Sequence, residues 1–416
     1  MTQNTTTVSS IERSAARARL KTVLLVSLAS LFGLSVWFST NAISSALEVE
    51  KSLGEQDVAW LTIAVQLGFV FGTLVIAFTN LADLLNARRL FMLSAISAGL
   101  LNLLIIPLDS LPLLILVRFG TGAALAGVYP PAMKVLSGWY NRNRGFALGM
   151  MVGALTVGSG SPHLLRSVFV GNWQAVILGS SFLAFAGGLI MLLLVKDGPY
   201  EVPAAKFRPS SMLKLFTERG LRLTLVGYLG HMWELYAMWA WIGAFMTYII
   251  GTRPLVGDSV DLASGLTFGV FFVGAVASPL AGVLAERWGR TVVTSMAIVL
   301  SGSMALIIGF LPYELLPLIL VAAMIWGATV IADSAQFSTA ITELAEPEYR
   351  GTMLTFQTGL GFLLTAASIW LVPVLQDATG WGVAFAVLAI GPVIGTLAML
   401  RLRVLPEARR LAGGKG

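Results

Sequence analysis

The sequence predicts an all-α membrane protein with twelve transmembrane helices arranged in two similar six-helix bundles. Three observations support this fold class. Hydrophobic residues make up 56% of the 416 residues and charged residues only 12%, whereas a soluble protein carries about 25% charged residues. The apolar residues fall into twelve runs long enough to cross a bilayer as helices. Short charged patterns also recur about 205 residues apart, which indicates one unit used twice.

Each apolar run is interpreted as a helix, because a backbone that faces lipid must satisfy its own hydrogen bonds. The expected limits are 22–46, 58–79, 89–107, 111–135, 146–168, 174–195, 222–250, 262–284, 291–311, 315–340, 352–375 and 382–400. In the fourth run, Tyr129-Pro130-Pro131 predicts a kink, since proline lacks a backbone N–H and its ring clashes with the preceding turn.

Two charged patterns recur at nearly equal spacing. Asp83, among several charged residues after the second run, and Glu286, in the same position after the eighth run, are 203 residues apart. The Arg-Gly pairs that begin at Arg144 and Arg350 are 206 residues apart. Matching offsets at two places support a duplicated unit. We therefore expect an N-terminal six-helix bundle and a C-terminal six-helix bundle.

A polar, proline-containing stretch separates the expected bundles. It covers residues 196–221, so the expected domains are residues 1–195, this linker and residues 222–416. The lysines and arginines of the short loops collect on the side of the membrane that holds this linker and both termini, which the positive-inside rule assigns to the cytoplasm. We expect a multi-pass protein of the plasma membrane, here the bacterial inner membrane, that works as a monomer.

Composition and motifs argue against several other functions. The chain has no cysteine, so disulfides and thiolate metal sites are excluded. The net charge of +6 is distributed as membrane topology requires, and we expect no nucleic-acid partner. No phosphate-binding G-x-x-x-x-G-K-[ST] motif is present. We expect no enzyme activity, cofactor or metal; the expected partners are a small-molecule substrate, protons and the lipid bilayer.

The charged patterns resemble a loop motif of the major facilitator superfamily, G-x-L-A-D-R-x-G-R-R. The second copy matches this motif from Gly282 to Arg290, with Glu286 in place of the aspartate, whereas the first copy keeps Asp83 but loses both glycines. The resemblance covers essentially the whole chain and implies two six-helix bundles that alternately open to each side. It also implies that the acid and its arginines form a cytoplasmic gate. The expected gating residues are Asp83, Arg88, Glu286, Arg287 and Arg290.

Three charged residues lie well inside apolar runs, away from the run ends, where a charge costs about 2.5–3.5 kcal/mol. Arg118 lies in a stretch that resembles the family motif L-x-x-x-R-x-x-x-G, which implies a role in proton coupling. Glu234 lies in the seventh run, three residues after His231 and on the same helix face, and Asp333 lies in the tenth. Desolvation favours the protonated carboxyl, so we expect Glu234 to be the main proton site. We expect His231 to tune it, with assistance from Asp333 and Arg118.

The substrate is expected between the first, fourth, seventh and tenth runs, which line the central cavity in this family. The candidate substrate-binding residues are Trp37, Asn41, Arg118, Trp233, Tyr236 and Gln336. We predict a secondary transporter that works by alternating access, with proton-coupled uptake of a small organic anion attracted by Arg118. Two alternatives remain open. One is proton-driven efflux of amphipathic or drug-like compounds, and the other is a non-transporting membrane sensor or scaffold.

Overall fold

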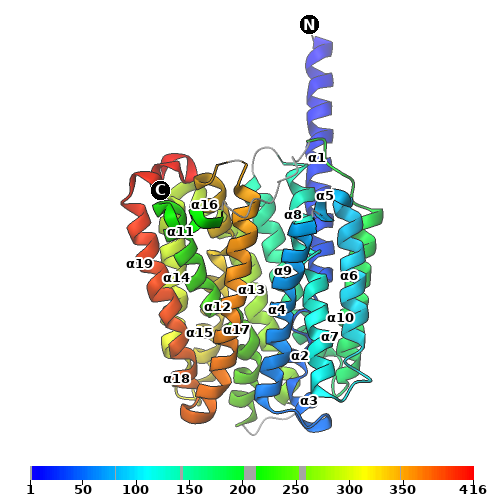
Figure 1. Ribbon diagram of the computed structural model, residues 1–416, viewed down its shortest axis with the longest axis vertical. Coiled ribbons are helices and arrows are strands. Elements are labelled where there is room, and N and C mark those ends of the chain that lie inside the picture. Colours follow the sequence, from blue (N-terminus) through cyan, green and yellow to red (C-terminus); the bar gives the residue numbers. More distant parts are fainter. Residues whose placement is uncertain (1, 80, 141–143, 201–211, 253–258, 347) are drawn as a thin grey trace.

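The computed structural model describes residues 2–79, 81–140, 144–200, 212–252, 259–346 and 348–416. Every regular element in these ranges is a helix (Figure 1). The first half of the chain forms α1 (Thr2–Gly33), α2 (Ser39–Ala42), α3 (Ser44–Glu50), α4 (Glu55–Thr79), α5 (Leu81–Leu84), α6 (Ala87–Leu103), α7 (Leu111–Leu125), α8 (Tyr129–Ser137), α9 (Arg144–Val168) and α10 (Trp173–Leu193).

The second half of the chain is helical in the same way. It forms α11 (Lys214–Thr217), α12 (Arg219–Gly251), α13 (Ser259–Trp288), α14 (Arg290–Ile307), η2 (Ile308–Phe310), α15 (Leu316–Ala332), α16 (Ser334–Leu344), α17 (Arg350–Thr379), α18 (Trp381–Ala386), η3 (Val387–Ala389), α19 (Ile390–Arg403), η4 (Pro406–Arg410) and η5 (Ala412–Gly414). These helices run roughly along one direction, and both termini lie toward the same end of the molecule (Figure 1).

Eight segments of the described chain are long and apolar enough to cross a membrane. They are α4, α7–α8, α10, α13, α14–η2, α15–α16, α17 and α18–α19. The four other expected spans correspond to α1, α6, α9 and α12. Of these, α6 is only 17 residues long, while α12 buries polar side chains that lower its hydropathy. The expected all-α membrane fold is confirmed.

Three of the expected spans are broken. The fourth breaks between α7 and α8, directly before Pro130 and Pro131, so the predicted kink is confirmed. The first was expected as one helix over 22–46, but α1 ends at Gly33 and helical structure resumes at Ser39. The tenth breaks at Asp333, between α15 and α16. A broken helix frees backbone polar groups, which need partners inside the protein.

Helices of the two halves meet along two seams, α9 with α13 and α4 with α17. Close approach of α9 and α13 requires glycine in α9, because a Cβ added to Gly153 would lie 2.5 Å from the backbone oxygen of Ala275. Arg166 of α9 and Asp261 of α13 add an ion pair of 3.8 Å between largely buried side chains. Between α4 and α17, the rings of Phe69 and Phe362 lie 4.6 Å apart.

Candidate functional site

A central cavity of about 90 Å³ lies between the two halves of the chain. Its wall is built by the α1–α2 break, α4, α8 and α9 from the first half, and by α12, α15, α16 and α17 from the second. The lining residues are Leu34, Trp37, Phe69, Tyr129, Val152, Leu155, Thr156, Ser159, Tyr228, Met232, Leu235, Tyr236, Trp239, Ile331, Ser334, Ser338, Thr358 and Phe362. The lining is therefore aromatic, aliphatic and hydroxyl-bearing, and no described lining residue is charged.

Packed aromatic rings join the two halves at this cavity. Trp37 lies 5.2 Å from Phe69, 5.5 Å from Phe362 and 5.9 Å from Tyr236, measured between ring centroids. Beyond Trp37 along the chain, the Asn41 side chain donates a hydrogen bond of 3.2 Å to the backbone oxygen of Ala240. Asn41 belongs to α2, which lies away from the end that carries the termini (Figure 1). The halves are thus joined between the cavity and that opposite end.

Arg118 is placed differently from the expected substrate-binding residue. Its side chain is fully buried and donates to the backbone oxygen of Val36 at 3.0 Å and also to that of Trp37. A further bond of 3.3 Å reaches the hydroxyl of Ser39. Val36 and Trp37 belong to the α1–α2 break and Ser39 begins α2, so Arg118 binds backbone oxygens that the interrupted helix leaves free. It does not line the cavity, so its expected role in attracting an anion stays a prediction.

The expected proton-coupling residues are buried but do not line the cavity. Glu234 is 2% exposed and accepts hydrogen bonds from the indole N–H of Trp326 at 2.7 Å and the hydroxyl of Ser301 at 2.8 Å. Its contacts are therefore with α14 and α15. The neighbouring residues Met232 and Leu235 line the cavity, whereas Glu234 does not. The Glu234 carboxyl is therefore held by α14 and α15 and is not part of the cavity wall.

His231 contacts Asp333 rather than Glu234. Its Nδ1 lies 2.8 Å from a carboxylate oxygen of Asp333, and both side chains are almost completely buried. The expected direct influence of His231 on Glu234 is thus replaced by a buried pair that joins α12 to the α15–α16 break. The sequence spacing alone favours a pair of His231 with Glu234 within α12, because residues three apart share a helix face.

The other expected substrate-binding residues divide into two groups. Trp37 and Tyr236 line the cavity. Trp233 instead donates from its indole to the backbone oxygen of Val387 at 3.3 Å, and Asn41 joins α2 to α12 as described above. Gln336 accepts a hydrogen bond of 3.0 Å from Arg290. The latter three make contacts between helices in this structure, and their role in substrate binding stays a prediction.

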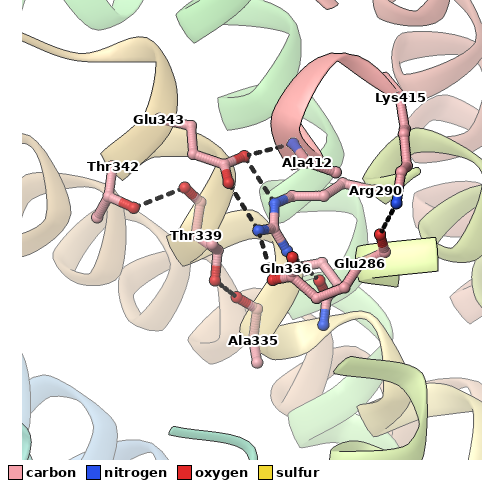
Figure 2. A network of polar contacts seen from close by, with 9 residues as sticks. All are labelled: Glu286, Arg290, Ala335, Gln336, Thr339, Thr342, Glu343, Ala412 and Lys415. Atoms are coloured by element: carbon pink, nitrogen blue, oxygen red, sulfur yellow. Dashed lines mark hydrogen bonds and ion pairs between the residues drawn. The ribbon is translucent and has the colours of Figure 1, made fainter. Parts of the chain in front are cut away.

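Figure 2 shows the network around the second charged pattern. Arg290 binds both carboxylate oxygens of Glu343, at 2.6 and 2.7 Å, and one of Glu286 at 3.0 Å. The chain after α19 folds back here, where Lys415 donates to the backbone oxygen of Glu286 and the backbone N–H of Ala412 donates to Glu343. The network connects α13, α14, α16 and the C-terminal segment. Sequence reasoning missed Glu343, because it is distant in sequence from the motif.

Arg287 is the exception within this pattern. It is exposed and makes no ion pair with any described residue, so Arg290 alone takes the expected position between the acids. The difference follows from helix geometry. Glu286 and Arg290 are four residues apart and lie on one face, whereas Arg287 directly follows Glu286 and so lies on a different face.

The first charged pattern uses a different acid. Arg88 binds Asp197 through two nitrogens, at 2.8 and 3.1 Å, and donates to the backbone oxygen of Val195 at 2.8 Å. Arg88 therefore ties the start of α6 to the end of α10. The side chain of Asp83 lies outside the described part of the chain, so its gating role stays a prediction.

Replacing Asp197 by Asn should lower stability slightly, by about 0.5–1 kcal/mol, because Asp197 is half exposed and solvent screens the pair. Partial burial raises the pKa of Asp197, but hydrogen bonds from Arg88 and Asn86 outweigh it and hold the pKa below its ordinary value of 3.8. The contribution of the Arg88–Asp197 pair to stability is therefore complete above pH 3.8 and is lost as pH falls through the lowered pKa of Asp197.

Melting of wild type and Asp197→Asn in detergent, at pH about 7 and about 3, checks this. The difference in melting temperature between the two proteins should shrink at the lower pH. Glu314→Gln, which alters an exposed acid in the loop before α15, is the control and should melt as wild type does. An equal difference at both pH values would contradict the assigned ion pair.

Apolar helices around a central cavity built by both halves of the chain define a secondary membrane transporter rather than an enzyme. Comparison with known proteins agrees. The family model described as Major Facilitator Superfamily matches residues 25–256, and the model described as Sugar (and other) transporter matches residues 225–410. The chain belongs to the Major Facilitator Superfamily, whose members are transporters.

Individual relatives are distant. The protein named MFS transporter asaE from Aspergillus flavus is 25% identical over 346 residues, which cover 79% of this chain and 73% of that protein. An uncharacterized transporter of Buchnera aphidicola is 25% identical over 239 residues, covering 56% of this chain and 57% of that protein.

Solved structures show the same fold at lower identity. A bacterial homolog of the human lysosomal transporter Spinster, in an inward-facing and unoccupied conformation, superposes with a TM-score of 0.67 at 16% identity, over 94% of this chain and 97% of that one. The nucleoside transporter NupG superposes with a TM-score of 0.68 at 13% identity, over 92% of this chain and 99% of that one. Both comparisons establish the fold alone.

Proposed function

We propose that this protein is a proton-coupled secondary transporter that takes up a small organic solute by alternating access. The observation that carries the proposal is a central cavity lined by both halves of the chain, with buried ionisable side chains directly behind its wall. Residues 1–195 and 222–416 act as the two moving bundles, and residues 196–221 as their linker. Rocking of the bundles exposes the cavity to each side in turn.

Proton coupling is assigned to Glu234 and to the His231–Asp333 pair. Buried ionisable groups in a membrane are costly and mark proton pathways in transporters. Asp333 lies at the α15–α16 break, directly before the lining residue Ser334, and His231 precedes the lining residue Met232. A change of charge on either group therefore acts on the helix segments that form the cavity wall.

The gate and the orientation of the protein in the membrane belong to the same proposal. The network of Arg290, Glu286 and Glu343 stabilises the second bundle at the end that carries the termini, and Arg88 supports the equivalent end of the first bundle. These two ends close against each other when the bundles rock. We place both termini in the cytoplasm and the protein in the bacterial inner membrane, following the distribution of lysine and arginine between loops.

The test is solute-driven proton movement in liposomes that contain the purified protein and a trapped pH-sensitive dye. Addition of a library of neutral and ionic metabolites outside should identify at least one that acidifies the lumen only when the protein is present. An imposed inward proton gradient should drive accumulation of that solute. Protein-dependent uptake that is indifferent to the gradient would refute proton coupling, and absence of uptake for the whole library would refute transport.

Efflux of amphipathic compounds is a second candidate, favoured by the seven aromatic side chains that line the cavity. The same liposomes distinguish it, because an inward proton gradient would expel solute from the lumen by proton antiport, whereas it would accumulate solute by proton symport.

A further inference from the structure

The wall of the central cavity offers no charge to a bound solute. Each charged side chain near it is already engaged elsewhere: Arg118 with the backbone of the α1–α2 break, Glu234 with Trp326 and Ser301, and His231 with Asp333. An ionised solute would lose hydration here without gaining a countercharge, which is a large free-energy penalty. The cavity therefore discriminates against both anions and cations.

Neutral hydrogen-bonding groups on this wall are available to a solute. The indole N–H of Trp37 is buried and makes no hydrogen bond to any described residue. The hydroxyl-bearing residues Ser159 on α9, and Ser334 and Ser338 on α16, also line the cavity. Ser334 and Ser338 are four residues apart and so share a face of α16. A buried donor without an acceptor is costly, and a solute oxygen would remove that cost.

Aromatic rings complete the wall. The rings of Trp37 and Tyr236 are 5.9 Å apart and those of Tyr236 and Trp239 are 5.5 Å apart, and all three line the cavity. A planar or puckered ring packs well against such surfaces. Pockets of this kind bind their ligands through apolar area, with a few polar groups that fix orientation.

We propose that the transported solute is electrically neutral, contains a ring and carries several hydroxyl or carbonyl oxygens. One oxygen accepts the indole N–H of Trp37, and others bond to Ser159 in the first half and to Ser334 and Ser338 in the second. The solute thus bridges both halves, as a carrier that rocks around its substrate requires. This inference rests on the proposed transport function and specifies its substrate class.

Three probes of related size test the charge preference by ligand-induced thermal stabilisation. They are p-nitrophenyl β-glucoside, which is neutral, p-nitrophenyl β-glucuronide, in which a carboxylate replaces the hydroxymethyl group of the glucoside, and tetraphenylphosphonium, an apolar cation. The glucoside should bind at millimolar concentration or below, and at least about tenfold more tightly than either ion. Tighter binding of the glucuronide or the phosphonium would overturn the proposal, as would failure of the glucoside to bind.

Matched tryptophan variants test the assigned donor. Trp37→Phe keeps the ring but removes the N–H, and should weaken glucoside binding about threefold to tenfold. Trp173→Phe removes another buried indole N–H without a hydrogen-bond partner, which does not line the cavity, and should leave the affinity unchanged. Equal effects of the two variants would overturn the assignment. Ser334→Ala with Ser338→Ala gives a second measurement if Trp37→Phe does not fold.

Uptake into liposomes separates the failure of this inference from the failure of the proposed function. Protein-dependent uptake of the glucuronide in preference to the glucoside would overturn the substrate class while transport stands. Absence of uptake for every compound in the metabolite library would instead refute transport itself.

Discussion

Glu234→Gln should abolish accumulation of the solute against its gradient while leaving exchange of the solute intact. The amide cannot release a proton, yet it fits the same space beside Trp326 and Ser301. A gradient of about one pH unit supports about a tenfold concentration ratio for each coupled proton. In the variant this ratio should fall to about one, as it does in wild type when an ionophore collapses the gradient.

The measurement compares gradient-driven uptake with counterflow, in which labelled solute outside exchanges for unlabelled solute inside. Counterflow needs no net proton movement, so its retention shows that the variant is folded and binds solute. Glu314→Gln is the matched control, since it removes an exposed acid from a loop, and should accumulate solute normally. If Glu234→Gln keeps full coupling and Asp333→Asn loses it, the proton site belongs to the His231–Asp333 pair instead.

Arg118→Met should lower the free energy of unfolding by about 2–5 kcal/mol. The guanidinium binds the backbone oxygens of Val36 and Trp37, and each buried oxygen left without a donor costs about 1–3 kcal/mol. Removing the charge also relieves the cost of burying it, since no described acid is paired with Arg118. We expect the lost hydrogen bonds to outweigh that relief, because they hold the interrupted first helix together.

Thermal melting of the purified variants in detergent checks this, with Arg118→Lys expected between wild type and Arg118→Met. Arg287→Ala removes an exposed arginine that has no ion pair among the described residues, and should melt as wild type does. A melting temperature of Arg118→Met at or above that of wild type would show that the buried charge costs more than its hydrogen bonds contribute.

Much of the candidate site could be predicted from the residues themselves. A charge in an apolar run is costly enough to be conspicuous, so Arg118, Glu234 and Asp333 were identified without coordinates. Their partners were not predictable in the same way. His231 binds Asp333, which is about one hundred residues away in sequence, and Glu343 reaches Arg290 from another helix. Such pairs depend on how helices are rotated and stacked.

The sequence by itself determined the solvent, the fold class and the break before Pro130 and Pro131. These properties follow from apolar run length, the distribution of charge between loops and local backbone chemistry, all of which are additive along the chain. Only the tertiary structure decided which side of each helix faces the cavity. It placed Trp37, Ser159 and Ser334 in the cavity wall and left Arg118 and Glu234 outside it, because helix packing, rather than composition, sets the direction in which a side chain points.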